Sequence, residues 1–223
     1  MEIRRGGIVR VLIPVCVLGV FLATLAGCGS VYYAAWEKMG KEKRDLLRDQ
    51  VEAVQDDQKE AAETFETVLD RVRQAYGLEG GDLEKFYDRM KGDYGEAVER
   101  SQAVSERSRK VKIIAHDLFL EWEREARDIQ NTKLRARSMT SLARSRDRFS
   151  RLEKALDRSV AGMEPVLADL NDYVLFLKHN LNARAVGSLT QEVDGIQVQV
   201  KDLLADMNRS IEEAKAFLKD FEK

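Results

Sequence analysis

A heptad pattern of apolar residues runs through almost the whole chain after residue 30, and it constrains the fold more than any other feature. Such a pattern places one apolar stripe along an α-helix, and the stripe must be buried against another helix. Only one proline, Pro165, interrupts this part of the chain. The first stretch alternates steps of four and three residues through Leu47, Val51, Val54, Gln58, Ala61, Phe65, Val68 and Val72.

Three further stretches continue the pattern, and no stretch alternates with the period of a β-strand. They run from Met90 to Ile129, from Leu134 to Leu181 and from Leu189 to Leu218. Glycines or asparagine stand at the breaks between them, where helices commonly end. The sequence therefore predicts helices over about 31–76, 82–130, 133–186 and 189–221.

Short connections between long helices force neighbouring helices to be antiparallel. The expected fold is all-α: an elongated up-down-up-down bundle of four long helices with coiled-coil-like seams. We expect residues 28–223 to form this single domain. Pro165, three residues after Gly162, is expected to kink or split the third helix, since proline removes a backbone hydrogen bond.

The first 28 residues have the order of an export signal. Three arginines precede an apolar run over residues 11–26, which is too short to span a membrane comfortably. The run closes on Leu25, Ala26, Gly27 and Cys28, a pattern that resembles the lipobox of bacterial lipoproteins. The alternative interpretation is an ordinary small residue near an ordinary cleavage site.

Lipidation would remove residues 1–27 and make Cys28 the first residue of the mature chain. More than one acyl chain makes membrane attachment durable. Gly29 and Ser30 follow Cys28, with no Asp directly after it. By similarity to sorted lipoproteins, this favours the periplasmic face of the outer membrane over the inner membrane. No other cysteine follows Cys28, so no disulfide is expected.

Charged residues are segregated along the chain, although the totals of 37 basic and 39 acidic residues nearly balance. Residues 49–70 hold eight acidic residues and one basic, whereas residues 133–158 hold nine basic and three acidic. Opposite charges beside helix seams help to select partners, so we expect the two runs to be compensated mainly within the molecule. Anionic envelope components are the second interpretation. Nucleic acid is not expected as a partner.

The sequence contains no pattern typical of catalysis or metal binding. His116 and His179 lie on different predicted helices, and neither has a ligand-type residue three or four positions away. Asp117 points about 100° around the helix from His116, so their adjacency does not predict a catalytic pair. We expect no catalytic residue, no metal site and no cofactor.

Aromatic residues follow Cys28 closely, and two interpretations are open for them. Tyr32, Tyr33 and Trp36 could lie at the level of the lipid headgroups, or Trp36 could begin the core of the bundle. We favour the core for Trp36 and for Trp122. The expected hairpin register places these two indoles at the same level.

Several short stretches after Cys28 carry a resemblance to a known family. They are Tyr32-Tyr33 with Glu37-Lys38, Gly81-Asp82-Leu83-Glu84, Glu121-Trp122-Glu123, Met163-Glu164-Pro165 and Leu175 to Ala185. The chain resembles the bacterial family called domain of unknown function 2959 over nearly its whole mature length. The resemblance implies an all-helical envelope lipoprotein of Gram-negative bacteria, and it implies no activity or substrate.

The leading hypothesis is a non-enzymatic adaptor, spacer or regulator that contacts an unknown envelope protein or a second copy of itself. In the expected register, the end of the third helix reaches the turn between the first two helices and forms a tip. An ordinary helix ending is the alternative interpretation of the same polar residues. The candidate partner-binding residues of this tip are Lys178, His179, Asn180, Asn182 and Arg184.

A second hypothesis is a lipid- or cell-wall-binding carrier whose helices open near Pro165. An apolar pocket near Met163 and Leu167 would favour the carrier, whereas a closed seam would favour the adaptor. An enzyme is the least expected class, because no residue can be named as its general acid, base or nucleophile.

Overall fold

The structure of the protein is a computed structural model, which describes residues 33, 40–74, 82–180 and 190–221. The described residues contain four long helices and no strand, which confirms the all-α prediction. The chain divides into two compact units, Met1–Leu46 and Leu47–Lys223. The helices are α3 (Lys43–Gln74), α4 (Asp82–Asp128), α5 (Thr132–His179) and α7 (Thr190–Phe221).

The beginning of α3 differs from the expected helix over 31–76. Gly40 has a φ of 76°, a left-handed conformation that glycine adopts without strain, and residues 41–42 are not helical. The backbone N–H of Glu42 donates to the Asp45 carboxylate at 3.3 Å, an arrangement that resembles a capping box. The expectation of one continuous helix from residue 31 is therefore wrong, and α3 begins at Lys43.

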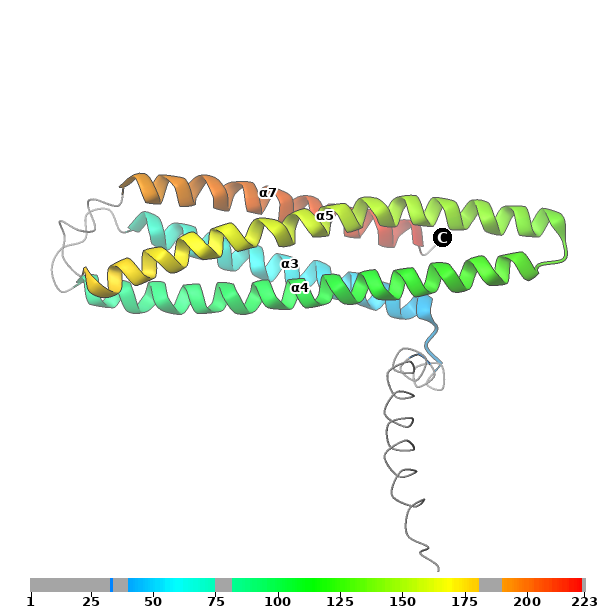
Figure 1. Ribbon diagram of the computed structural model, residues 1–223, viewed down its shortest axis with the longest axis horizontal. Coiled ribbons are helices and arrows are strands. Elements are labelled where there is room, and N and C mark those ends of the chain that lie inside the picture. Colours follow the sequence, from blue (N-terminus) through cyan, green and yellow to red (C-terminus); the bar gives the residue numbers. More distant parts are fainter. Residues whose placement is uncertain (1–32, 34–39, 75–81, 181–189, 222–223) are drawn as a thin grey trace, which may run out of the picture. The chain divides into compact units, whose positions relative to one another are not determined.

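Within the second unit, α4 packs against α5 and α5 packs against α7 (Figure 1). Ion pairs also connect α3 with α4. Arg107 Nε donates to Asp57 Oδ2 at 2.9 Å, and Arg71 Nε donates to Asp93 Oδ2 at 2.7 Å. Residues later in α3 thus pair with residues earlier in α4, so these two helices are antiparallel. The prediction of a helical bundle is confirmed.

The apolar seam of the bundle follows the predicted heptad positions closely. Every position expected to face inward on α3, from Leu47 to Val72, is fully buried. On α4, Met90, Val104 and Val111 are likewise fully buried. Because a period of 3.5 residues selects one face of a helix, the seam could be identified from the sequence alone.

Two inward positions of the third and fourth helices were assigned incorrectly. Leu134 is 53% exposed, although it continues the seam spacing of α5. On α7, Phe217 rather than Leu218 is the buried residue near the end of the helix, and its ring lies 5.8 Å from that of Phe149. The Phe149 ring also makes an edge contact with Phe119 of α4 at 5.7 Å, so aromatic packing between three helices selects Phe217.

Trp122 is half-buried on α4, and its indole N–H donates to Ser138 Oγ of α5 at 2.9 Å. The indole therefore joins α4 to α5 near the turn between them. Trp36 lies outside the described residues. The expected common level of the two indoles stays a prediction.

Pro165 does not split the third helix, contrary to one of the two expected outcomes. α5 passes through it as one continuous ribbon that changes direction along its length (Figure 1). Both Pro165 and Ala161, the residue whose carbonyl loses its helical hydrogen bond, are exposed. Water can therefore bind that carbonyl, and the helix continues to His179.

The third helix ends earlier than the expected residue 186. Asn180 leaves the helical conformation with φ −130° and ψ 48°, and its N–H donates to the carbonyl of Leu177 at 3.2 Å. Its side-chain amide donates to the carbonyl of Phe176 at 3.0 Å. Asn180 thus provides donors for carbonyls that the helix end leaves free. At the other end of α5, Asn131 accepts from the N–H groups of Lys133 and Leu134.

Candidate functional site

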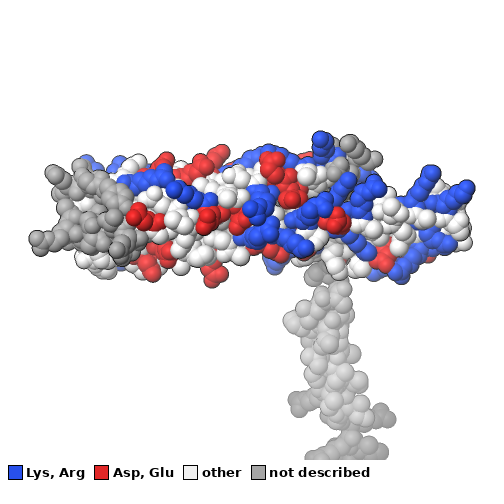
Figure 2. Space-filling view, turned by 90° about the horizontal axis from the view of Figure 1, so that it is seen from above, with Lys and Arg blue, Asp and Glu red and all other residues white. Residues whose placement is uncertain are grey.

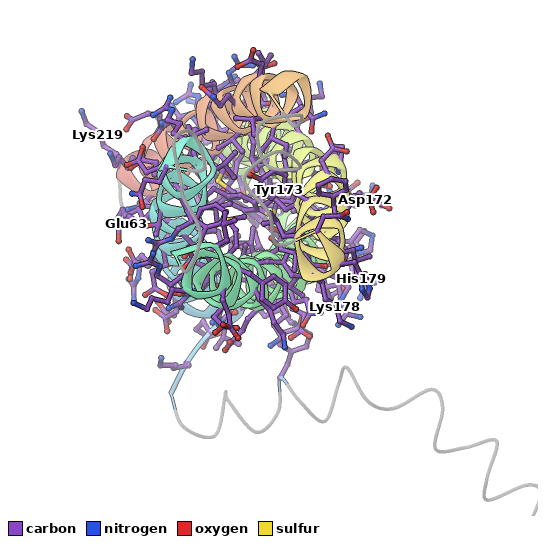
Figure 3. All side chains as sticks on the ribbon, turned by 90° about the vertical axis from the view of Figure 1, so that its left-hand side faces the viewer. Glu63, Asp172, Tyr173, Lys178, His179 and Lys219 are labelled. Carbon is purple, nitrogen blue, oxygen red and sulfur yellow. The ribbon has the colours of Figure 1, made fainter. Side chains whose placement is uncertain are left out.

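The predicted tip is described only in part. Lys178 and His179 are exposed at the end of α5, and Figure 3 shows both side chains directed outward, whereas Tyr173 points between the helices. Asn180 is half-exposed and makes the capping bonds given above. Asn182 and Arg184 lie outside the described residues. The motif Leu25, Ala26, Gly27 and Cys28 lies outside them as well.

A second feature stands at the other end of α5, where the sequence analysis placed no site. α4 and α5 contain 47 and 48 residues, whereas α3 and α7 contain 32 each. The surplus is 15 residues for α4 and 16 for α5, which corresponds to about 22–24 Å of helix. Figure 1 shows α4 and α5 continuing as a pair past the end of α7. We call residues 117–146 the hairpin arm.

The α5 side of the hairpin arm is basic. From Thr132 to Arg146 there are five basic residues and no acidic residue. Blue side chains predominate over this end in Figure 2, whereas red and blue alternate over the rest of the visible bundle. Four of the five are exposed and form no ion pair with any residue that the structure describes: Lys133, Arg135, Arg137 and Arg144. Lys133, Arg137 and Arg144 share one face of the helix, and we call these three residues the cationic stripe.

Exposed apolar side chains accompany these charges. Leu134 is 53% exposed and Met139 is 36% exposed. Leu134 lies in the first turn of α5, three residues after the capping Asn131, where Figure 1 shows no third helix beside the pair. Burial of a seam residue there depends on two helices instead of four, which explains why the expectation for Leu134 was wrong.

A shallow pocket of about 280 Å³ lies between α4 and α5 at the base of the hairpin arm. Its cations are already paired: Lys112 donates to Asp157 at 2.7 Å, and Arg146 donates to Glu123 at 2.7 Å. Because these charges are compensated within the protein, the pocket has no cation available for an anionic ligand. Its lining residues are Lys112, His116, Phe119, Leu120, Arg146, Phe149, Ser150 and Glu153.

Glu123 is the centre of the polar contacts beside this pocket. Arg146 donates to its carboxylate and also to the backbone carbonyl of Phe119 at 3.1 Å, and Arg127 pairs with the other carboxylate oxygen. The hydrogen bond from Arg146, together with the positive charge of Arg127, lowers the pKa of Glu123. These contacts hold α4 and α5 together along a section where each has fewer neighbours.

The two charge runs are compensated within the bundle, but not mainly by each other. From the acidic run of α3, Asp57 and Glu60 pair with Arg107 and Arg100 of α4. From the basic run of α5, Arg151 lies 3.9 Å from Glu213 of α7. The expectation of intramolecular compensation thus holds for part of each run, and it fails for the cationic stripe and for Arg135 and Lys154 of the basic run, which form no ion pair with the described residues.

His116 and Asp117 are in contact on the surface of α4. The His116 Nδ1 atom lies 3.3 Å from Asp117 Oδ1, because side-chain rotation brings the two groups together across the helix surface. The His116 side chain is 70% exposed. A solvent-exposed pair of this kind has no surrounding structure that would orient it for proton transfer.

The seam around Pro165 is closed, which is the outcome that favours the adaptor over the carrier. Met163 and Val166 are both buried in the core. A Cβ atom added to Gly162 would meet Leu203 Cδ1 of α7 at 3.3 Å, so α5 and α7 are closely packed here. The pocket between α4 and α5 is not lined by Met163 or Leu167. It is therefore not the apolar pocket that the carrier hypothesis requires.

In the described part of the chain, none of the helices combines the length and apolar character needed to cross a membrane. The same residues contain no group of three or more His, Cys, Asp or Glu side chains arranged to hold a metal ion.

Comparison with known proteins identifies the family. Searches among curated proteins and among solved structures found no match. A family model described as "Protein of unknown function (DUF2959)" matches residues 32–221, which covers all four helices. The family that the sequence resembles is thus confirmed over most of the chain, and this protein belongs to the DUF2959 family.

Proposed function

We propose that this chain is a non-enzymatic lipoprotein, attached through Cys28 to the periplasmic face of the outer membrane. In this proposal it acts as an adaptor, spacer or regulator through contacts with an envelope protein or with a second copy of itself. The support for attachment is the Leu25-Ala26-Gly27-Cys28 motif at the end of an apolar run. Fewer than 20 residues separate Cys28 from the first residue of α3.

The observation that carries the adaptor proposal is the contrast between neighbouring residues at the end of α5. Tyr173 and Leu177 are buried in the seam, whereas Lys178 and His179 are exposed and directed outward (Figure 3). The seam holds the helix end in place and leaves two chargeable side chains available to a partner. An exposed polar pair on a rigid helix can make specific contacts at little cost to folding.

Replacement of Cys28 tests the attachment. Cys28→Ala removes the thiol that would carry the lipid, so we expect the protein to remain uncleaved or to leave the outer-membrane fraction. Cys16→Ala is the matched control, because Cys16 lies inside the apolar run and should not be required. Membrane fractionation with mass measurement of the mature chain gives the readout. Outer-membrane partitioning of Cys28→Ala equal to that of the parent would show that the attachment is wrong.

In-cell crosslinking tests the partner surface. A photoreactive residue at position 178, which is exposed and directed outward beside His179, should capture a discrete partner, which mass spectrometry identifies as another protein or as a second copy. The same residue at Glu63, which is exposed on α3 and directed outward in Figure 3, is the control and should not capture that species. Equal capture from both positions, or none from position 178, would contradict a partner surface at the end of α5.

A further inference from the structure

We propose that the cationic stripe of α5 binds the anionic headgroups of a phospholipid bilayer. This contact is separate from the lipid at Cys28 and from the partner surface at the end of α5. It involves the hairpin arm, for which neither the family nor the proposed adaptor function supplies a role. The proposal therefore stands or fails independently of lipidation.

The stripe is a continuous feature of one helix face. Lys133, Arg137 and Arg144 are spaced by four and then seven residues, which places them within about 40° of one another around the helix. The α5 side chains that are not exposed between Lys133 and Arg144, Ser138 and Leu142, lie elsewhere on the circumference. The three cations thus point away from α4 and can contact a flat surface together.

No acidic side chain among the described residues pairs with the cations of the stripe. The three cations have no ion pair in the part of the chain that the structure describes, and Thr132 to Arg146 contains no acidic residue. The neighbouring Arg146, by contrast, is held by Glu123 at 2.7 Å. Basic residues near an anionic bilayer contribute about 1 kcal/mol each, so three of them correspond to roughly a 100-fold change in binding.

The exposed Leu134 favours a lipid bilayer over other anionic surfaces as the partner of the cationic stripe. It is 53% exposed and lies about 60° around the helix from Arg137. A leucine beside cations matches the boundary between headgroups and acyl chains, where apolar side chains enter while basic side chains stay at the phosphates. An apolar side chain with this exposure has no comparable partner on a purely polar polyanion.

Two other occupants fit the stripe less well. A second copy of the hairpin arm would bring two basic stripes together, and like charges repel. Single-stranded nucleic acid is usually held by aromatic side chains that stack on bases, and Thr132 to Arg146 contains no Phe, Tyr or Trp. The charge and the exposed leucine together favour lipid.

A fluorescent label on the hairpin arm tests the proposal in the full chain. Leu134→Cys is labelled with an environment-sensitive dye, and the protein is mixed with vesicles of phosphatidylcholine alone or with added phosphatidylglycerol. We expect a blue shift only with the anionic vesicles. Labelling of the parent chain gives the background from Cys16 and Cys28. Val198→Cys, also exposed and apolar but on α7, should show no such shift.

Charge-neutral variants then separate the stripe from general electrostatics. Lys133→Gln, Arg137→Gln and Arg144→Gln together should weaken insertion of the label at position 134 by roughly 100-fold. Lys85→Gln, Arg89→Gln and Lys91→Gln remove three exposed cations from the other end of α4 and should leave insertion unchanged. Circular dichroism checks that both variants remain helical.

Three outcomes would overturn the proposal. The first is an emission spectrum that does not change with anionic vesicles. The second is a shift that survives neutralisation of the stripe or is lost equally in the α4 control. The third is a stripe-dependent shift produced by an oligonucleotide but not by lipid, which would assign the stripe to nucleic acid.

Discussion

Ser159 Oγ of α5 donates a hydrogen bond of 2.8 Å to Gln58 Oε1 of α3, and both residues are fully buried. The pair joins residues 101 positions apart in the sequence. Gln58 Nε2 has no hydrogen-bond partner among the described residues. A hydrogen-bonded polar pair in a mostly apolar seam disfavours other alignments of the helices, because a shift by one turn would leave both groups unpaired.

Breaking this pair from one side should be costly. Ser159→Ala leaves the Gln58 carbonyl oxygen buried without a donor, so we expect a loss of about 1–3 kcal/mol in the free energy of unfolding. The double variant Gln58→Met with Ser159→Ala removes both polar groups and should recover most of that loss. Urea denaturation measures both values. A double variant no more stable than Ser159→Ala alone would contradict the account.

Glu123 should make the bundle sensitive to acid. Its pKa is lowered in the folded state, first by the hydrogen bond from Arg146 and then by the charge of Arg127. A carboxylate with a lowered folded pKa adds stability that is complete above its unfolded pKa, about 4.3, and is lost as the pH falls through the folded pKa. Glu123→Gln should therefore lower the urea midpoint at pH 7 and reduce its change towards pH 3.

The control for this effect is on the same helix. Glu125 is exposed and forms no ion pair with the described residues. Glu125→Gln should leave both the midpoint at pH 7 and its pH dependence nearly unchanged. Equal effects of the two substitutions would show that the contacts of Glu123 with Arg146 and Arg127 do not stabilise the fold.

Substitution of alanine for the glycines inside helices should change the stability of the protein by different amounts. Nothing lies within 4 Å of a Cβ added to Gly92 or Gly95 of α4, so Gly92→Ala and Gly95→Ala should each stabilise the protein by about 0.5–1 kcal/mol. At Gly162 the added Cβ would meet Leu203 Cδ1 at 3.3 Å. Gly162→Ala should gain less, because Leu203 must move. Thermal unfolding compares the three, and an equal gain at Gly162 would contradict close packing of α5 against α7.

The end of α5 should separate structural from surface residues. Leu177 is fully buried, and Leu177→Ala should cost about 2–5 kcal/mol. His179 is exposed, and His179→Ala should cost under about 0.5 kcal/mol while abolishing the partner crosslink. Denaturation and crosslinking of the same two variants give the result. A His179→Ala variant that unfolds as readily as Leu177→Ala would assign His179 a structural role.

Much of the fold could be predicted from local patterns. The buried face of α3 from Leu47 to Val72 follows from its heptad spacing, because that spacing places every apolar residue on one side of a helix. The start of α5 follows from Asn131, whose side chain accepts from two N–H groups that the helix cannot pair internally. The early end of α5 at His179 was missed, although Asn180 carried a signal for it.

The candidate surfaces depend on information that is not local. Heptad spacing alone determined that Leu134 could face a seam, but its exposure depends on which helices reach its level. Residue composition alone determined that residues 133–158 are basic, whereas only the tertiary structure decided which cations are paired. The direction of a side chain around its helix axis is set by its position in the sequence. Its burial and its ion partners are set by the lengths and alignment of the neighbouring helices.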